Sequence, residues 1–158
     1  MKKILVLNGP NLNLLGQREP GQYGHDTLDD VERMCKQEGE KLGVEIDCLQ
    51  SNHEGQLIDW IHLAGREQAA GNLLGVVFNP GAYTHTSIAL HDAIKGTSAS
   101  VIELHISNVH ARESFRHRSY ISPVARGVMV GFGVQGYLFA IGALVRLAEP
   151  ATVAKPAG

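Results

Sequence analysis

The sequence predicts a doubly wound α/β domain, in which helices cover both faces of a mostly parallel sheet. Three apolar runs rich in β-branched or aromatic residues, at 3–8, 75–79 and 100–107, alternate with segments whose apolar residues recur at helical spacing. Buried strands that alternate with helices imply right-handed crossovers and a sheet covered on both sides. The length of 158 residues matches one such domain.

The elements follow one another as strand and helix. Weaker strands are predicted at 44–50 and 127–132. The first helix has the clearest boundaries, because Thr27 and Asp30 form a capping-box pattern and Gly43 stops the helical period. Further helices are predicted around 57–64, 88–94 with a stop at Gly96, and 138–145. We expect a single catalytic domain over 1–149 and a loose tail over 150–158.

Charge and cysteine content limit the possible partners. The formal net charge is −2, with 14 basic and 16 acidic residues spread along the chain, so we expect neither nucleic acid nor an anionic membrane as a partner. Cys35 and Cys48 show no metal spacing and fit a reducing compartment. The first apolar run is short and no cleavage site follows it, so we expect a cytoplasmic protein.

Polar residues stand where the predicted strands end, which is where open α/β sheets bind ligands. The first strand ends at Asn8 and leads to Asn11, and the third ends at Asn79. In the fourth, a period of two places Glu103, His105 and Ser107 on one face. Their burial requires mutual hydrogen bonds. This pattern indicates either an acid–base group at a cleft or a polar network that only fixes packing.

Two further segments flank these strand ends. The stretch THTSIALHD predicts a helix start capped by Thr84 or Thr86, able to receive an anion, although plain capping explains it equally well. Histidine spacing, including that of His85 and His91, does not match a metal site, and we expect none. Clustered arginines follow the fourth strand and favour at least one ligand contact; they are Arg112, Arg116 and Arg118.

The segment GFGVQG, residues 131–136, matches the glycine pattern of dinucleotide-binding proteins. That fingerprint needs a following strand and an acidic residue about 20 positions on, and the chain supplies neither. The glycines therefore predict a tight turn and close packing, and we expect no bound cofactor.

Taken together, the loop NGPNLNLLGQREPGQYG and the motifs NPGAYTHTS, ELHISNVHARESFRHRSY and GFGVQGY resemble those of the type II 3-dehydroquinate dehydratases. The resemblance covers nearly the whole chain. It implies a flavodoxin-like sheet of order 2-1-3-4-5 and a dodecamer built from trimers. It also implies anti elimination of water from 3-dehydroquinate, giving 3-dehydroshikimate, either in the shikimate pathway to aromatic amino acids or in quinate catabolism.

The same resemblance implies roles for individual residues. Tyr23 is the expected base and Arg18 the cation that favours its phenolate, in a loop whose glycines and Pro20 allow closure. Asn11 stabilises the enolate through a water molecule, and His105 is the general acid with Glu103 beside it. Substrate contacts are expected from Asn79, His85, the backbone N–H groups of Ile106 and Ser107, Arg112, Arg116, and Asp92 of a neighbouring subunit.

Two other functions are compatible with parts of the sequence. A flavodoxin-like binding module would explain the fold but not the combination of Arg18, Tyr23 and His105. An enzyme that forms an imine with the same ketone needs a lysine at a strand end. The lysines fall instead at the termini or on outer helix surfaces; they are Lys2, Lys3, Lys36, Lys41, Lys95 and Lys155.

Overall fold

The computed structural model describes residues 1–17, 21 and 24–149. Five parallel strands form one sheet in the order β2-β1-β3-β4-β5, which confirms the predicted fold class and strand order. The strands are β1 (Lys3–Asn8), β2 (Glu45–Gln50), β3 (Leu73–Asn79), β4 (Val101–His105) and β5 (Gly127–Val130). The expected tail at 150–158 lies outside the described residues.

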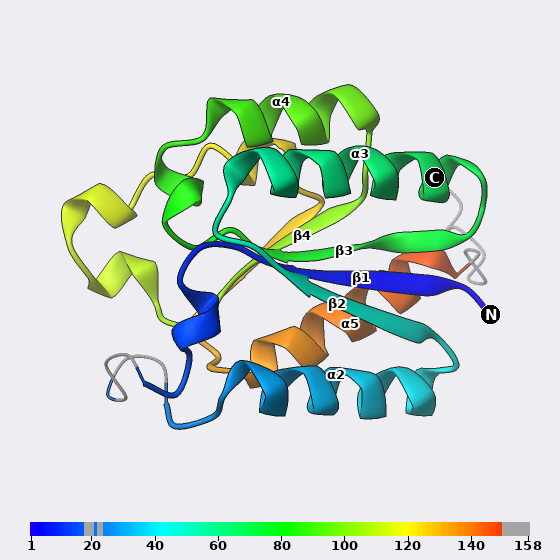
Figure 1. Cartoon of the computed structure of the whole chain (residues 1–158), viewed down its shortest axis with the longest axis horizontal. Helices are drawn as coiled ribbons and strands as arrows, with labels where there is room; N and C mark the ends of the chain where they lie inside the picture. Colours follow the sequence, from blue (N-terminus) through cyan, green and yellow to red (C-terminus); the bar gives the residue numbers. More distant parts are fainter. Residues whose placement is uncertain (18–20, 22–23, 150–158) are drawn as a thin grey trace, which may run out of the picture.

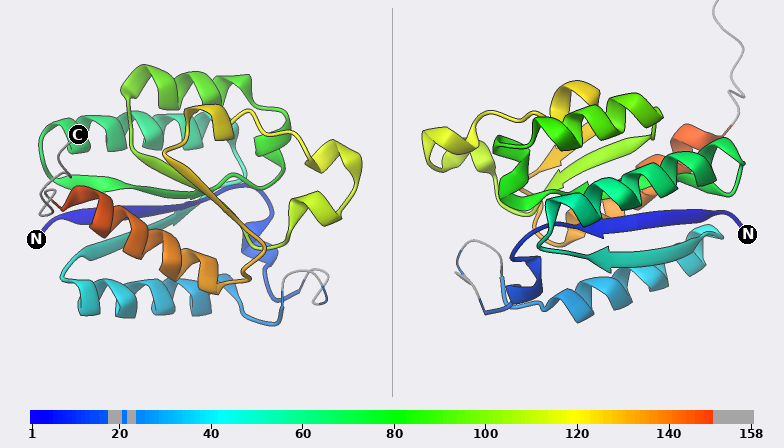
Figure 2. Two further views of the ribbon diagram at one scale, coloured as in Figure 1. Left: turned by 180° about the vertical axis from the view of Figure 1, so that it is seen from behind. Right: turned by 45° about the horizontal axis from the view of Figure 1, so that its top comes forward.

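Helices form a layer on each side of the sheet (Figure 1). On one side lie α3 (Glu54–Ala69) and α4 (Ile88–Thr97). On the other lie α2 (Leu28–Leu42) and α5 (Gln135–Ala148), the latter crossing the sheet obliquely in Figure 2. No helix in the described ranges is long and apolar enough to cross a membrane.

Both faces of the central strands are buried, as a doubly wound sheet requires. Ile4 and Val6 of β1 pack in the core under α2 and α5, whereas Leu5 and Leu7 pack in the core under α3 and α4. This alternation follows from the period of two of a strand. In β4 the second face carries Glu103 in place of an apolar residue, and its exposed fraction is only 1%.

Helix boundaries confirm some predicted signals and correct others. The capping box of α2 is complete, because the Thr27 side chain accepts from the Asp30 N–H and the Asp30 carboxylate accepts from the Thr27 N–H. Gly43 ends this helix with a φ of 73°, a conformation that glycine adopts without strain.

The cap of α4 was predicted wrongly. Neither Thr84 nor Thr86 caps it, because residues 81–85 form the separate 3₁₀ helix η2 and the Thr84 side chain is buried. Ser87 caps α4 instead, its Oγ accepting from the Leu90 N–H. The helix also runs one residue past Gly96 and ends at Thr97.

Candidate active site

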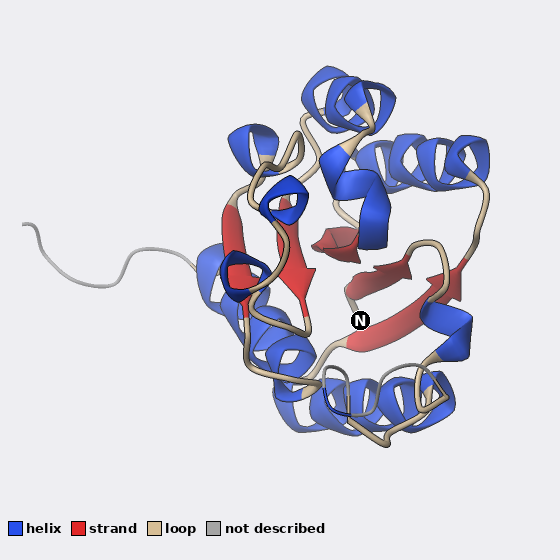
Figure 3. Ribbon diagram, turned by 90° about the vertical axis from the view of Figure 1, so that its left-hand side faces the viewer, coloured by secondary structure: helices blue, strands red, loops and turns tan. Residues whose placement is uncertain are grey.

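A cavity of about 220 Å³ opens at the carboxyl edge of the sheet, the edge that faces the viewer in Figure 3. It is bordered by the loop after β1, by η2 (Gly81–His85) after β3, and by the end of β4. Its lining residues are Pro10, Asn11, Leu12, Asn79, Gly81, Ala82, His85, His105, Ile106, Ser107, Val109, Arg112 and Arg116. The structure therefore gathers most of the predicted site residues around one cavity.

His105 lines this cavity and is hydrogen-bonded to Glu103, which lies behind it and does not line the cavity. The Nε2 atom of His105 is 2.6 Å from Oε2 of Glu103, and both side chains are buried. Burial by itself raises the pKa of the Glu103 carboxyl, but hydrogen bonds from His105, Ser122 and Thr84 outweigh it and hold that pKa below its ordinary value. Glu103 is thus an anion at neutral pH, and its partner His105 reaches the cavity.

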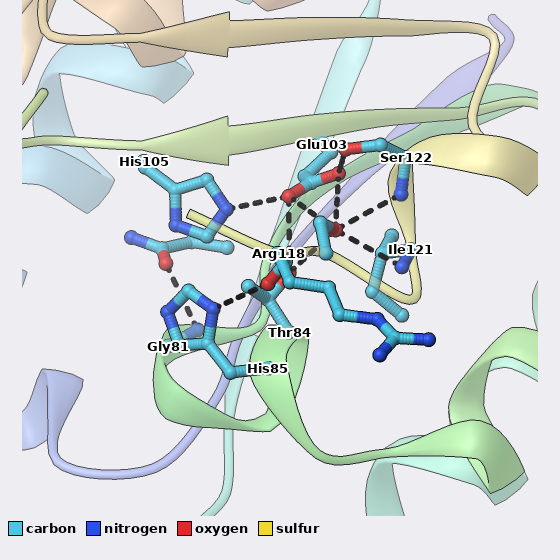
Figure 4. Close-up of polar contacts among 10 residues, drawn as sticks. Gly81, Thr84, His85, Glu103, His105, Arg118, Ile121 and Ser122 are labelled. Carbon is cyan, nitrogen blue, oxygen red and sulfur yellow. Dashed lines mark hydrogen bonds and ion pairs between the residues drawn. The ribbon is translucent and has the colours of Figure 1, made fainter. Parts of the chain in front are cut away.

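His85 lies beside His105, with the two rings stacked at a centroid distance of 6.3 Å (Figure 4). Its Nδ1 is 2.7 Å from the carbonyl oxygen of Arg118, so Nδ1–H donates there. Burial lowers the pKa of His85 despite that hydrogen bond. A neutral His85 therefore presents the lone pair of Nε2 as a hydrogen-bond acceptor.

Two of the three clustered arginines line the cavity. Arg112 donates from Nη1 to the Ser107 hydroxyl at 3.1 Å, and Arg116 donates to the Glu113 carboxylate at 3.2 Å. Arg118 does not line the cavity, because its guanidinium stacks over the Tyr120 ring. Of the three clustered arginines, only Arg112 and Arg116 are therefore placed to contact a ligand in this cavity.

The described part of the opening loop is held against the β2–α3 connection. Asn11 has a φ of 68° and donates its N–H to Oδ1 of Asn52 at 2.9 Å. An asparagine tolerates this left-handed conformation better than most residues. The predicted base and its cation, Tyr23 and Arg18, lie outside the described residues.

Asn79 is fixed by a contact that sequence reasoning missed. Its Nδ2 donates to the Tyr137 hydroxyl at 3.0 Å, and that hydroxyl donates to Oδ1 of Asn8 at 2.6 Å. Asn79 also accepts from the Gly81 N–H at 3.1 Å. Tyr137 thus connects the ends of β1 and β3 from α5. In the sequence, only the position of Tyr137 directly after GFGVQG could have indicated that it belongs to the site.

Three hydroxyl groups around Glu103 were also missed as site residues. They belong to Thr84, Ser119 and Ser122, and all three donate to the carboxylate. The sequence pattern predicts Thr84 only as a candidate helix cap. Nothing in the local sequence near Ser119 or Ser122 points to a residue on β4.

Asp92 is the one predicted substrate contact that this chain does not bring to the cavity. It lies on α4, is exposed, and is not among the cavity-lining residues.

The glycines of GFGVQG form a turn between β5 and α5, as predicted. Gly131 and Gly133 have φ values of 87° and 63°, and their N–H groups donate to the carbonyls of His105 and Ile106. A Cβ on Gly136 would lie 2.7 Å from Leu104 Cδ1, so the Leu104 side chain would have to shift to admit any larger residue at this approach of α5 to β4. The turn therefore supports the end of β4.

The fold and cavity define an α/β protein of flavodoxin-like strand order with an acid–base pair at the carboxyl ends of its strands. In comparisons with known proteins, a family model described as dehydroquinase class II matches residues 2–145. The chain therefore belongs to the type II dehydroquinase family, whose enzymes are hydro-lyases.

Named relatives agree with this assignment. The chain is 78% identical over 145 residues to a 3-dehydroquinate dehydratase of Variovorax paradoxus (strain S110), covering 92% of this chain and 99% of the relative. It is 69% identical to 3-dehydroquinate dehydratase 2 of Ralstonia nicotianae (strain ATCC BAA-1114 / GMI1000), covering 95% and 97%. The crystal structure of type II dehydroquinase from Propionibacterium acnes matches with a TM-score of 0.87 and 42% identity, over 92% of this chain and 97% of that one.

Proposed function

We propose that this chain is a type II 3-dehydroquinate dehydratase, which removes water from 3-dehydroquinate to form 3-dehydroshikimate. The observation that carries the proposal is the buried Glu103–His105 pair, in which His105 lines the strand-end cavity. An elimination of water needs a proton for the leaving hydroxyl, and a histidine beside a carboxylate can deliver it. We infer the identity of the substrate from the family match and from the names of the relatives.

The proposed reaction begins at the carbon next to the ketone. The Tyr23 phenolate removes a proton there, and the electron pair of the broken C–H bond forms an enolate. Because an unperturbed tyrosine has a pKa of about 10, this step requires a cation such as Arg18 close by. Asn11, whose backbone is fixed at the cavity edge, orients a water molecule that donates to the enolate oxygen.

The second step breaks the carbon–oxygen bond. The enolate electrons form the new C=C bond, the ketone is restored, and the hydroxyl leaves with a proton from His105. The ring nitrogen bonded to Glu103 is Nε2, so Nδ1 is the nitrogen that gives up this proton. The products are water and a conjugated enone, and the two steps require no cofactor.

The remaining residues around the cavity bind the substrate. Arg112 and Arg116 provide positive charge for its carboxylate, and His85 and Asn79 hydrogen-bond its hydroxyl groups. The N–H groups of Ile106 and Ser107 contribute further donors. Asp92 of a neighbouring subunit completes the site in a dodecamer built from trimers, with residues 1–149 as the catalytic domain. We place the enzyme in the cytoplasm, in the shikimate pathway or in quinate catabolism.

An ultraviolet assay tests the activity directly. Purified protein with 3-dehydroquinate should produce the rising absorbance of a conjugated enone, and no change would refute the proposed function. A flavin- or nucleotide-binding module would instead show no turnover and would carry a visible or ultraviolet absorption band as purified.

Borohydride distinguishes the enolate route from an imine route. No lysine lines the described part of the cavity, so borohydride added with substrate should leave the enzyme active. Substrate trapped covalently on a lysine, detected by mass spectrometry, would contradict the enolate mechanism.

A further inference from the structure

Glu103 is surrounded by hydrogen-bond donors in the interior of the protein. Oε2 accepts from Thr84 Oγ1 at 3.0 Å, and Oε1 accepts from Ser122 Oγ at 2.5 Å. Ser119 Oγ is within 3.1 Å of both carboxylate oxygens. Together with the ring nitrogen of His105, these groups form a cradle around one buried carboxylate (Figure 4).

The direction of the Ser119 hydrogen bond follows from its other contacts. Its oxygen accepts from the N–H groups of Ile121 and Ser122, each at 3.0 Å. A hydroxyl has two lone pairs and one hydrogen, so the hydrogen of Ser119 remains for an acceptor. Glu103 is that acceptor. A protonated Glu103 carboxyl would need an acceptor for its own hydrogen, but the neighbouring hydroxyl groups already act as donors to it.

The segment that carries the two serines is anchored to η2 and α4. The Tyr120 N–H donates to the Thr84 carbonyl at 2.8 Å. His85 and His91 bind the carbonyls of Arg118 and Tyr120 through Nδ1, at 2.7 and 2.6 Å. These backbone contacts place the serine hydroxyls independently of the charge on Glu103.

Other titratable side chains lie around the pair. His85 stacks on His105 from the cavity side. A second cavity of about 190 Å³ lies against Glu103 and His105, and its lining includes Arg116, His110 and His117. None of these three has a hydrogen bond to Glu103 in the described part of the chain; the hydroxyls and His105 alone make those bonds.

We propose that Thr84, Ser119 and Ser122 are positioning residues that hold Glu103 as a carboxylate and so keep the ring proton of His105 on Nε2. If Glu103 instead took the Nε2 proton from an imidazolium that carries a proton on each ring nitrogen, its new O–H would donate to Nε2. The ring left behind would be neutral, with its single proton on Nδ1, and a neutral ring is a far weaker acid at Nδ1. With the proton held on Nε2, a second proton on Nδ1 makes an imidazolium that can pass this second proton to a leaving hydroxyl. The catalytic consequence rests on the proposed function, whereas the position of the proton does not.

The test combines Thr84→Val, Ser122→Ala and the double variant. Nitrogen-15 NMR of histidine-labelled protein reports whether Nε2 of His105 carries a proton, with the signal assigned through a His105→Asn sample. Wild-type protein should show a protonated Nε2, and the double variant should show an unprotonated Nε2 with a proton on Nδ1. Thr84→Ser and Ser122→Thr restore a hydroxyl and should restore the wild-type signal.

Kinetics provide the second measurement. Each lost hydroxyl should lower kcat about tenfold, as expected for a hydrogen bond to a charged group, while KM changes less than about threefold. Ser87→Ala is the matched control, since Ser87 is a buried serine that caps α4 and makes no bond to Glu103. It should lower stability without changing the NMR signal or kcat.

The outcomes separate this inference from the proposed function. A protonated Nε2 in the folded variants, with kcat equal to that of Ser87→Ala, would overturn the inference. If the double variant does not fold, the nitrogen-15 signal of His105 Nε2 in the two single variants tests the inference instead. Wild-type protein without dehydratase activity would refute the proposed function, while the NMR result would still decide the role of the three hydroxyls.

Discussion

Replacing Tyr137 by phenylalanine should destabilise the protein more than any other loss of a single tyrosine hydroxyl in the described chain. Tyr137 is fully buried, and its hydroxyl donates to Asn8 and accepts from Asn79. Burial raises the pKa of this phenol above its ordinary value, so it stays protonated at every working pH. The substitution removes one oxygen atom and leaves both asparagines in place.

The expected magnitude follows from the two partners. Asn8 and Asn79 have exposed fractions of 2% and 4%, so water does not readily replace the missing hydroxyl. A buried polar group left without a partner costs about 1–3 kcal/mol, which gives about 4 kcal/mol for the two. For a chain of this size that corresponds to a fall of roughly 10 °C in the melting temperature. Because Asn79 lines the cavity, kcat/KM should also fall, by about tenfold.

Tyr83→Phe is the matched control. Its hydroxyl donates to the Asn52 carbonyl at 2.7 Å in a half-exposed setting, where water can take over, so its loss should cost about 1 kcal/mol or less. Thermal and denaturant unfolding of both variants at one protein concentration gives the comparison. Equal stability of the two variants would show that the Asn8–Tyr137–Asn79 contacts contribute little.

Three further perturbations test the site. The Glu103→Gln substitution should lower stability at neutral pH. Because the pKa of Glu103 in the folded protein lies below its ordinary value, the difference in stability from wild type should shrink as the pH falls through that folded pKa. A pH-independent difference in denaturant midpoint would contradict this. Tyr23→Phe should keep substrate binding while kcat drops by about a thousandfold or more, because the ring cannot accept a proton; wild-type kcat would exclude Tyr23 as the base. Mixed oligomers of Tyr23→Phe and Asp92→Ala subunits should regain activity over either parent, and no gain would exclude a shared site.

Much of the fold could be predicted from local sequence. Strand and helix periods gave the doubly wound class, and the Thr27 capping box and Gly43 marked the ends of α2. These signals work because they depend on residues within one or two turns of each other. The cap of α4 was predicted wrongly because it depends on distant contacts: the Thr84 hydroxyl donates to Glu103 on β4, and Ser87 caps the helix instead.

The sequence predicted some contacts of the candidate site and not others. The period of two along the fourth strand predicted Glu103, His105 and Ser107 on one face, joined by hydrogen bonds. The structure contains this bond between Glu103 and His105 at 2.6 Å, whereas the Ser107 hydroxyl accepts from Arg112. The sequence shows that the arginines are clustered. It does not show that Arg118 stacks on Tyr120 while Arg112 and Arg116 face the cavity. A cluster in sequence does not specify the direction of each side chain.

The sequence by itself determined the order of strands and helices, the polar character of the strand ends and, through its motifs, the family. Only the tertiary structure decided which hydroxyls surround Glu103 and which phenol orients Asn79. Thr84 and Ser122 each lie 19 positions from Glu103, and Tyr137 lies 129 positions from Asn8. Contacts of this kind arise when separate elements pack around a buried polar group that must be hydrogen-bonded, and no local pattern in the chain records which partner will be near.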